Sequence, residues 1–420
     1  MLRGIKIKNN KNVSIKDTYK KYNKPDYVYI PLKTYNNTKF DILIKEGDYV
    51  LKGQIIARSK DKYDFPIHSS VSGIVKSIED KNYIDNSKVK SIIIENDFLD
   101  KEEKIGSKKK INTYTKDEVI NILKECGVVG MSGNNFPTYY KYGLELKINK
   151  LVINAVESES YLTSDFTIIN SKTSEILETI DALMEIFNID ECIIAVKDFN
   201  KKAIEDLVEY IGSYTKINIR SVKDSYTLGW EKYLVESLFN IKIKKYPIEK
   251  GILVDNVSTI YSIYKALKYR KPITERIVTF SGDALNNPQN ILVKIGTPIN
   301  EIINSIGGYK KDTQPTIIVN GPMMGIKLEN DTTAINKSVP GIVVLNYKEE
   351  EKEMECINCG KCVNICPVQI SPILIMSEKN KKIIKKLHPE KCISCGLCSY
   401  ICPSKIHLRE KVLNKIDSGE

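Results

Sequence analysis

The alternation of apolar and polar residues divides the chain into four regions. Residues from about 27 to 95 alternate short apolar runs with glycine turns, which is typical of β-strands. Apolar runs beside helical faces follow, then a second set of β-like runs from Arg276 to about Leu345, and finally a cysteine-rich segment. A chain of 420 residues suits three or four domains of roughly 100–200 residues each. The pattern predicts a multidomain α/β and α+β protein with units at 1–100, 111–250, 251–347 and 350–412.

Two glycine-containing segments indicate the fold of the first unit. Glu46–Ala57 contains Gly-Asp-x-Val-x-x-Gly-Gln, and His68–Val75 contains Ser-Gly-x-Val. This pattern is typical of the barrel-sandwich hybrid found in biotinyl and lipoyl carriers. A carrier presents a modifiable lysine at a hairpin tip, whereas the second segment offers serine and histidine. We therefore expect a barrel-sandwich hybrid with a structural role, and a structural role for His68.

The second unit combines buried strands with amphipathic helices. After a lysine-rich linker at 101–110, Thr115 to Glu118 reads as a capping box that begins a helix. Leu151–Val156 and Glu191–Val196 read as buried strands, and a helix follows each of them. The apolar faces of these helices are predicted at Ile176, Ile180, Leu183, Met184 and Phe187, and at Leu207 and Ile211. Strands that alternate with helices predict a Rossmann-like α/β layer, in which ligands gather at the carboxyl ends of the strands.

A glycine-rich turn in this unit is a candidate binding loop. Gly127, Gly130 and Gly133 precede Phe136-Pro-Thr138. Gly127 alone suits a plain helix C-cap. The additional glycines favour a concave turn whose N–H groups hold a phosphate or a flavin.

Acidic residues follow the first strand of the unit. Asn154, Glu157 and Glu159 are expected at the carboxyl end of that strand, where ligands bind in α/β folds. A solvated acidic loop is the alternative reading of the same residues.

The third unit returns to short β-like runs. Four strands are predicted at Val278–Gly282, Asn290–Val293, Thr316–Val319 and Gly341–Leu345, with one helix at Ile299–Ile306. Four strands and one helix favour a β-grasp fold.

Eight of the ten cysteines lie between Cys356 and Cys402, in two runs of the form C-x2-C-x2-C-x3-C-P. This is the run of bacterial two-cluster ferredoxins, in which three cysteines of one loop bind one [4Fe–4S] cluster and the fourth binds the other. Gly360 and Gly396 let the chain turn close to the inorganic core. The predicted ligand sets are Cys356, Cys359, Cys362 and Cys402 for the first cluster, and Cys366, Cys392, Cys395 and Cys398 for the second.

The alternative to iron–sulfur is a pair of four-cysteine zinc sites. Zinc knuckles use two C-x2-C pairs for each metal, whereas each run here supplies three close ligands and a fourth marked by proline. Between the runs, Ser371-Pro372 is expected to begin one connecting helix, with its apolar face at Ile373, Met376, Ile383, Ile384 and Leu387. Cys126 and Cys192 stand alone in apolar surroundings and are expected to be core thiols.

The composition indicates a globular protein with a basic surface. Hydrophobic residues make up 42%, charged residues 28%, and the formal net charge is +11. The lysines are scattered rather than gathered in a stripe, which argues against nucleic-acid binding and suits anionic lipid or acidic electron carriers. Since we find no apolar run of membrane-spanning length and no signal-peptide pattern at the start, we expect a cytoplasmic protein that docks on a membrane.

Taken in order, these segments resemble the C subunit of the Rnf complex, the ion-pumping NADH:ferredoxin oxidoreductase of bacteria. The resemblance covers almost the full length, and the middle part is also similar to the flavin-binding subunit of respiratory complex I. Its most specific segments are Gly127…Phe136-Pro-Thr, Asn154…Glu157-Ser-Glu159, Gly321-Pro-Met-Met-Gly325 and Cys398-Ser-Tyr-Ile-Cys-Pro-Ser-Lys405.

The resemblance implies cofactors, partners and a location. It implies that the α/β unit binds FMN and NADH, that a soluble-ligand-binding β-grasp (SLBB) domain follows, and that two [4Fe–4S] clusters carry the electrons onward. The implied partners are other Rnf subunits and ferredoxin or flavoprotein carriers, at the cytoplasmic face of the cell membrane.

Site residues are also carried over from the family. The roles implied are the FMN phosphate side at Gly127, Gly130 and Gly133, flavin contacts at Lys141, Asn154 and Glu157, the nicotinamide at Glu159, and a second nucleotide-contacting loop at Gly229 and Glu231.

The chain departs from the family pattern at several of these positions. Ser132 and Asn135 replace glycines in the loop, Asn134 replaces a small residue, and Ser158 stands where the family usually has cysteine. The added side chains predict weaker flavin retention than a glycine-complete loop gives. Two functions therefore remain: an NADH-oxidising Rnf subunit, or an electron-transfer adaptor without a nicotinamide site that serves an amino-acid reductase such as proline reductase.

Overall fold

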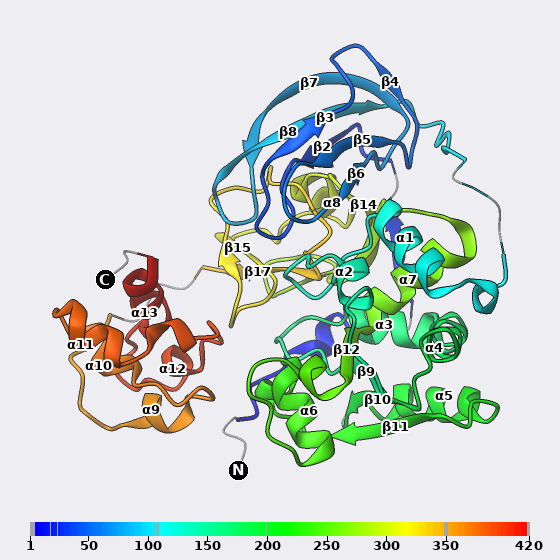
Figure 1. Cartoon of the computed structure of the whole chain (residues 1–420). Coiled ribbons are helices and arrows are strands. Elements are labelled where there is room, and N and C mark those ends of the chain that lie inside the picture. Colours follow the sequence, from blue (N-terminus) through cyan, green and yellow to red (C-terminus); the bar gives the residue numbers. More distant parts are fainter. Residues whose placement is uncertain are drawn as a thin grey trace.

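The computed structural model describes residues 5–16, 18–22, 24–104, 106, 109–198, 200–347 and 352–417. Three units form the body of the molecule, and the C-terminal segment forms a separate lobe beside it (Figure 1). In the part of the chain that the structure describes, no helix is long and apolar enough to cross a membrane.

The first unit consists of a four-stranded sheet in the order β2-β8-β7-β4 and a three-stranded sheet in the order β3-β5-β6. Alternate residues such as Val28, Ile30, Ile92 and Ile94 point inward and are buried, as the period of two in a half-buried strand requires. The strands are β2 (Tyr27–Pro31), β3 (Phe40–Ile42), β4 (Tyr49–Val50), β5 (Ile55–Ser59), β6 (Pro66–His68), β7 (Gly73–Asn82) and β8 (Lys88–Asn96).

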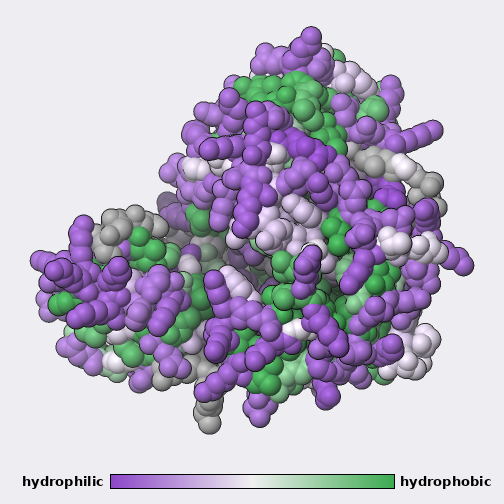
Figure 2. Space-filling model, viewed as in Figure 1, coloured by the Kyte–Doolittle hydropathy of each residue, from purple (hydrophilic) through white to green (hydrophobic). Residues whose placement is uncertain are grey.

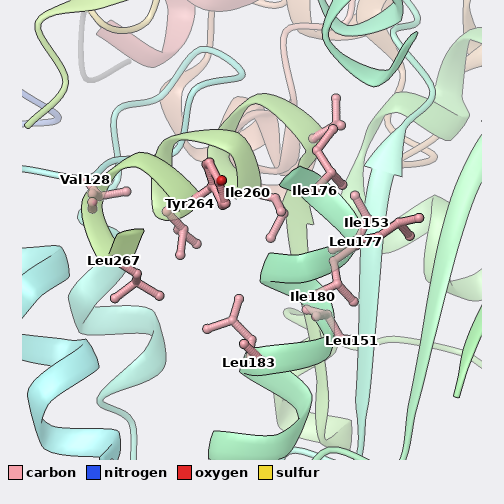
Figure 3. Packing of buried hydrophobic residues seen from close by; sticks show 14 of the residues in the cluster. Val128, Leu151, Ile153, Ile176, Leu177, Ile180, Leu183, Ile260, Tyr264 and Leu267 are labelled. Atoms are coloured by element: carbon pink, nitrogen blue, oxygen red, sulfur yellow. The ribbon is translucent and has the colours of Figure 1, made fainter. Parts of the chain in front are cut away.

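The second unit is a four-stranded parallel sheet in the order β11-β10-β9-β12. Helices α1, α3, α4 and α7 supply one large apolar core with β9. Figure 3 shows Leu151 and Ile153 of β9 beside apolar side chains of α4 and α7 in this core. The alternate residues Val152 and Val254 enter a second core with Leu234 of α6 on the other face. Its strands are β9 (Lys150–Ala155), β10 (Glu191–Lys197), β11 (Ile217–Val222) and β12 (Ile252–Asn256). Its helices are η2 (Ile111–Thr113), α1 (Lys116–Glu125), α2 (Thr138–Tyr142), α3 (Ser164–Ser171), α4 (Thr173–Phe187), α5 (Lys201–Ile211), η3 (Tyr226–Gly229), α6 (Glu231–Phe239), η4 (Pro247–Lys250) and α7 (Val257–Tyr269).

This unit extends beyond the boundary that the sequence pattern placed at residue 250. Strand β12 pairs with β9 in parallel, with Asn256 opposite Asn154. Helix α7 packs onto the same core through Ile260 and Ile263. The division at 250 was therefore one strand and one helix too early, because a parallel strand gains its partner from residues a hundred positions away.

The third unit is built on a six-stranded mixed sheet in the order β1-β14-β13-β17-β15-β16, with α8 packed on it through Ile302 and Ile303. The four predicted strands and the helix are present, and two short strands extend the sheet. Its elements are β1 (Lys20–Tyr22), β13 (Glu275–Ser281), β14 (Gln289–Lys294), α8 (Ile299–Ser305), β15 (Pro315–Val319), β16 (Ile326–Lys327) and β17 (Gly341–Asn346).

Ile5 and Asn9 fall within the predicted first unit at 1–100, and both make backbone hydrogen bonds to the second unit. The Ile5 carbonyl accepts a hydrogen bond from the Tyr226 N–H at 3.0 Å, and the Asn9 carbonyl accepts one from the Tyr161 N–H at 2.8 Å. A short helix, η1 (Lys11–Val13), follows, and β1 then joins the third unit beside β14. This segment therefore ties the α/β unit to the SLBB-like sheet.

The C-terminal lobe contains short helices around the two cysteine runs. They are α9 (Lys361–Ile365), α10 (Pro372–Ser377), α11 (Lys381–Lys386), η5 (Pro389–Lys391), α12 (Leu397–Tyr400) and α13 (Leu408–Asp417). The single connecting helix predicted from the sequence is wrong: α10 and α11 are separate. The Asn380 side chain accepts from the Lys382 N–H at 3.0 Å and so begins a new helix, and Ile383 of the expected apolar face is 43% exposed.

Candidate functional site

The first set of predicted cluster ligands surrounds one cavity in the lobe. Cys356, Cys359, Cys362 and Cys402 all line it, together with Gly360 and mainly apolar side chains. Cys356 and Cys359 are exposed to solvent. Among the described residues that line the cavity there is no carboxylate and no imidazole, and four thiols in an apolar wall are the donor set that a [4Fe–4S] cluster uses.

The second set surrounds a second cavity, lined by Cys366, Cys392, Cys395 and Cys398. The grouping crosses the two runs in the way the ferredoxin spacing predicts, since Cys366 comes from the first run. The Ser394 N–H lies 3.4 Å from Cys392 Sγ, and backbone N–H groups aimed at sulfur are a common feature of such loops. None of the four cysteines of this cavity is exposed, whereas the first cavity has two exposed cysteines, Cys356 and Cys359, beside the buried Cys362.

Hydrogen bonds with α7 and β13 hold the glycine-rich loop after α1 in place. The Met131 N–H donates to Thr259 Oγ1 at 3.0 Å, and Arg276 Nη2 donates to the Met131 carbonyl at 3.2 Å. The Gly130 N–H donates to the Phe136 carbonyl at 2.9 Å and closes the turn. The loop is therefore fixed at both sides of Met131 by the α7 and β13 elements.

Gly127 and Gly133 of this loop have different surroundings. Gly127 follows Cys126, the C-cap residue of α1, and has φ +59°. A Cβ placed on Gly127 lies close to the Pro66 carbonyl, His68 and Lys337. Gly127 is thus enclosed between three units and occupies the position after the helix C-cap, where a left-handed glycine is common. Gly133, with φ +133°, has open space where a Cβ would stand.

Asn135 is the departure from the family pattern with the clearest structural consequence. It replaces a glycine, adopts φ +55° and is 5% exposed. Its Oδ1 is buried and has no hydrogen-bond partner in the part of the chain that is described. A buried acceptor left unpaired costs about 1–3 kcal/mol unless a ligand or water satisfies it, so this loop is prepared for a hydrogen-bond donor.

Four of the predicted site residues meet at the carboxyl end of β9 and β12. Asn154 Nδ2 donates to the Gly229 carbonyl at 2.9 Å. Lys141 Nζ lies 3.6 Å from Glu231 Oε1 and 3.0 Å from Asp255 Oδ1. Burial alone lowers the pKa of the Lys141 ammonium, but the Asp255 and Glu231 carboxylates overcome this and raise it above its usual value. The strand ends therefore present a charged lysine between two carboxylates.

Gly229 is required by close packing at this point. A Cβ on Gly229 would overlap Ser158 Oγ, so the second nucleotide loop lies directly on the chain that follows β9. Ser158 is one of the positions where the family usually has cysteine, and its hydroxyl fills the space beside the glycine.

Glu157 lies at the beginning of α3. Its carboxylate accepts from the Asp165 N–H at 3.0 Å and the Phe166 N–H at 3.3 Å, at the beginning of α3. Lys11 Nζ of the N-terminal segment lies 3.8 Å from it. Glu157 also has φ +38°, an uncommon value for a non-glycine residue that marks a constrained position. The side chain thus caps a helix rather than facing an open cleft.

Glu159 is buried against the third unit. It accepts from the Tyr226 hydroxyl at 2.8 Å and from the Met323 and Met324 N–H groups at 3.2 and 3.0 Å. Burial raises the pKa of this carboxyl, and the three hydrogen bonds oppose that rise. The structure therefore places the predicted nicotinamide residue beneath the Gly321–Gly325 loop.

Several polar residues at the strand ends were missed by sequence reasoning. Asp165 accepts from Asn256 Nδ2 at 2.7 Å and from Ser258 Oγ at 2.5 Å, and Asn256 Nδ2 also lies 3.3 Å from the Asn154 carbonyl. Burial, and then the Glu157 carboxylate, raise the pKa of Asp165 to about 6. The signal was available in Asp255-Asn256-Val-Ser258, a strand end followed by an N-cap, but it fell beyond the predicted boundary.

Models of known families match all four units. They are the RnfC barrel-sandwich hybrid domain at residues 1–99, the Nuo51 FMN-binding domain at 123–265, the SLBB domain at 277–327 and the 4Fe-4S dicluster domain at 355–406. The predicted fold class is confirmed, with its barrel-sandwich hybrid, flavin-type α/β, SLBB and two-cluster domains.

Curated relatives extend over most of the chain. The C subunit of the Na(+)-translocating ferredoxin:NAD(+) oxidoreductase complex of Acetobacterium woodii is 31% identical over 84% of this chain and 81% of the relative. Its counterpart in the proton-translocating complex of Clostridium ljungdahlii is 32% identical over 84% of this chain and 78% of the relative. A longer relative, the C subunit of the ion-translocating oxidoreductase complex of Haemophilus influenzae, is 33% identical, and the match covers 82% of this chain and 54% of that protein.

A solved structure shares the fold. The NAD+-reducing [NiFe]-hydrogenase in the air-oxidized state superposes with a TM-score of 0.52 over 73% of this chain and 64% of that chain, at 14% identity. With an FMN-binding domain and a 4Fe-4S dicluster domain matched in place, and relatives that align along most of their length, the chain belongs to the family of C subunits of Rnf-type ion-translocating ferredoxin:NAD oxidoreductase complexes.

Proposed function

We propose that this chain exchanges electrons with NADH at a bound FMN and passes them one at a time through its two [4Fe–4S] clusters to other subunits of an Rnf-type complex. The observation that carries this proposal is the contact between the lobe and the α/β unit. Cys395, a predicted ligand of the second cluster, is buried in one apolar group with Tyr226 of the α/β unit. The flavin-type unit and a cluster site are thus in direct contact.

The residues at the strand ends fit FMN. The open space at Gly133 and the unpaired Asn135 Oδ1 supply a cradle and a hydrogen-bond acceptor, and Lys141 supplies a positive charge. Bound FMN would supply the chemistry that links a two-electron hydride transfer to single-electron steps. The chain's own contribution is to hold the cofactor, with Lys141 and Asn154 beside it, and to keep that charge fixed through Asp255.

We propose a role at the nicotinamide for Glu159, and this role requires its carboxylate to become accessible. In this structure the carboxylate is occupied by three donors of the chain. A direct role requires the Gly321–Gly325 loop to move away when NADH binds. Gly127 and Glu157 likewise require a rearrangement before they contact a nucleotide.

Titration of anaerobic protein with FMN and then NADH tests the function. We expect saturable FMN binding, and reduction of the clusters by NADH. The Lys141→Gln variant should bind FMN about tenfold or more weakly, because a charge-assisted hydrogen bond is lost. Lys150→Gln is the matched control, since Lys150 pairs with Glu191 at the opposite end of β9. If FMN does not bind saturably and only dithionite reduces the clusters, the chain is an adaptor that receives electrons from another flavoprotein.

We further propose that the protein docks at the cytoplasmic face of the membrane with ferredoxin or flavoprotein carriers as electron partners. The net charge of +11 supports attraction to anionic lipid and to acidic carriers. Such attraction is screened by salt. Membranes that contain the other Rnf subunits should therefore release the protein when they are washed at high ionic strength. Recovery in the soluble fraction at low salt would contradict membrane docking.

A further inference from the structure

The α/β unit holds the Gly321–Gly325 loop of the third unit through hydrogen bonds. The Met323 and Met324 N–H groups donate to the Glu159 carboxylate at 3.2 and 3.0 Å. A Cβ on Gly321, which has φ +98°, would lie 2.5 Å from Glu159 Oε2. The carboxylate therefore lies directly against the backbone of the loop and fixes its N–H groups.

The lobe also forms hydrogen bonds to this loop. Arg409 of α13 donates through Nη2 to the Met324 carbonyl at 2.7 Å and through Nη1 to the Gly325 carbonyl at 3.3 Å. Its Nε donates to Ser394 Oγ at 2.9 Å, inside the second cysteine run. The Glu159 carboxylate lies at N–H groups of the loop, and the Arg409 guanidinium lies at its carbonyl groups. These charges match the direction of the peptide dipoles, so both the donors and the acceptors of the loop have charged partners.

The two cysteine runs differ at an equivalent glycine. Gly360 and Gly396 follow the second cysteine of each run and have similar φ angles of +68° and +75°. A Cβ on Gly396 would lie 2.5 Å from the Met323 carbonyl oxygen, whereas a Cβ on Gly360 meets nothing within 4 Å. The loop therefore lies against the second run and leaves the first run open.

Burial at the two cluster cavities follows the same asymmetry. Cys395 and Leu397 are 8% and 0% exposed and pack with Tyr226 and Met323. The first cavity has exposed Cys356 and Cys359. In Figure 1 the lobe meets the body only along one side, and Figure 2 shows it standing out from the body with a largely hydrophilic surface.

We propose that the Gly321–Gly325 loop is a docking element that holds the lobe on the body through the second cysteine run. Each electron from the flavin-binding unit then reaches the second cluster first. It leaves through the exposed first cluster to another subunit of the complex. Each transfer oxidises the donor and reduces the acceptor by one electron, and no bond or proton changes hands in the lobe. Arg409 and Glu159 act as positioning residues. The direction of electron flow rests on the proposed function, whereas the docking itself does not.

The only tryptophan of the chain reports on this docking. Trp230 packs in the same apolar group as Cys395 and Leu397, and its ring centroid lies 5.2 Å from that of Tyr226. In the anaerobically prepared full-length protein, Gly396→Ala should displace the lobe and shift the Trp230 emission to longer wavelength. Gly360→Ala carries the same backbone strain without the clash, and it should leave the emission as in the parent protein.

A second variant tests the polar contacts without altering either glycine. Arg409→Gln removes charge-assisted hydrogen bonds to the loop, and the Met323 and Met324 amides should then exchange hydrogen about tenfold faster or more. Arg409→Lys should restore part of the protection. The rate at which NADH reduces the clusters should fall in Arg409→Gln while reduction by dithionite is unchanged.

Three outcomes overturn the proposal: equal Trp230 shifts in both glycine variants, no shift in Gly396→Ala, or unchanged amide exchange in Arg409→Gln. If the glycine variants fail to assemble clusters, the exchange measurement decides alone. Failure of NADH to reduce any form, the parent included, contradicts the proposed function. The fluorescence and exchange measurements need no nicotinamide and still test the docking.

Discussion

Replacing Glu159 by alanine removes one acceptor that holds three donors at the junction of two units, and we expect it to destabilise the fold. The Tyr226 hydroxyl and the N–H groups of Met323 and Met324 lose their partner together. Hydrogen bonds to a charged group contribute about 1.5–3 kcal/mol each. Burial of the carboxylate, which raises its pKa, offsets part of that sum.

The net loss for Glu159→Ala should be about 3–5 kcal/mol, since water fills some of the vacated space. A unit of this size shifts its melting temperature by about 2–4 °C for each kcal/mol, so we expect a decrease of roughly 10 °C. Tyr226→Phe removes one of the three hydrogen bonds and should cost about 1 kcal/mol. Glu159→Gln keeps an acceptor oxygen but turns an amide donor toward one of the three donors, and it should lie between these two.

Thermal denaturation followed by Trp230 emission measures this order, because Trp230 packs on Tyr226. The rate of flavin reduction by NADH is measured on the same samples. A structural role predicts that stability follows the number of hydrogen bonds lost. If Glu159→Gln slows the reduction by NADH and leaves the melting temperature unchanged, the carboxylate acts at the nicotinamide and the structural reasoning is refuted.

Three further predictions concern the clusters, the strand ends and the Gly229 contact. Anaerobic protein should contain about eight iron and eight labile sulfide per chain. Cys366→Ala should remove the second cluster and not the first, as measured by iron content and electron paramagnetic resonance. Loss of the first cluster alone would contradict the crossed ligand sets. Because folding raises the pKa of Asp165 from 3.8 to about 6, the folded protein binds this proton more tightly and stability falls as pH rises through that window; Asp165→Asn should flatten the pH dependence of the melting temperature there, and an unchanged slope contradicts it. Gly229→Ala should destabilise by about 1–3 kcal/mol through overlap with Ser158, and Ser158→Gly should relieve most of that loss in the double variant, measured by the same melts.

Local structure was predictable wherever the signal lies within a few residues. Thr115 and Glu118 form the predicted capping box, with both reciprocal hydrogen bonds present. The apolar face predicted for the helix after β9 is buried along α4, including Ile176 and Leu183. Each cavity of the lobe is lined by the four cysteines of one predicted ligand set. The ligand assignment itself stays a prediction from the ferredoxin spacing.

Long-range placement was not predictable from the same patterns. The partners of Glu159 lie more than sixty residues away in the sequence, at Tyr226 and at Met323 and Met324. No periodicity specifies which loop covers a carboxylate. The family resemblance supplied a role for Glu159, whereas its contacts depend on how the SLBB sheet is set against the α/β unit. The boundary at 250 failed for a related reason, since β12 finds its partner only in the assembled sheet.

One difference in sequence between the two cysteine runs nevertheless indicates which run of the lobe contacts the body. The residue after the turn glycine is Lys361 in the first run and Leu397 in the second. Leu397 is fully buried in the apolar group at the body, while Lys361 is exposed. A lysine at the docked position would place an unpaired ammonium in an apolar contact, which is strongly unfavourable, whereas a leucine there gains about 1.5–3 kcal/mol from burial. Two motifs with the same ligand spacing therefore differ in what surrounds them, and that surrounding, rather than the ligands, decides which cluster faces the flavin-binding unit.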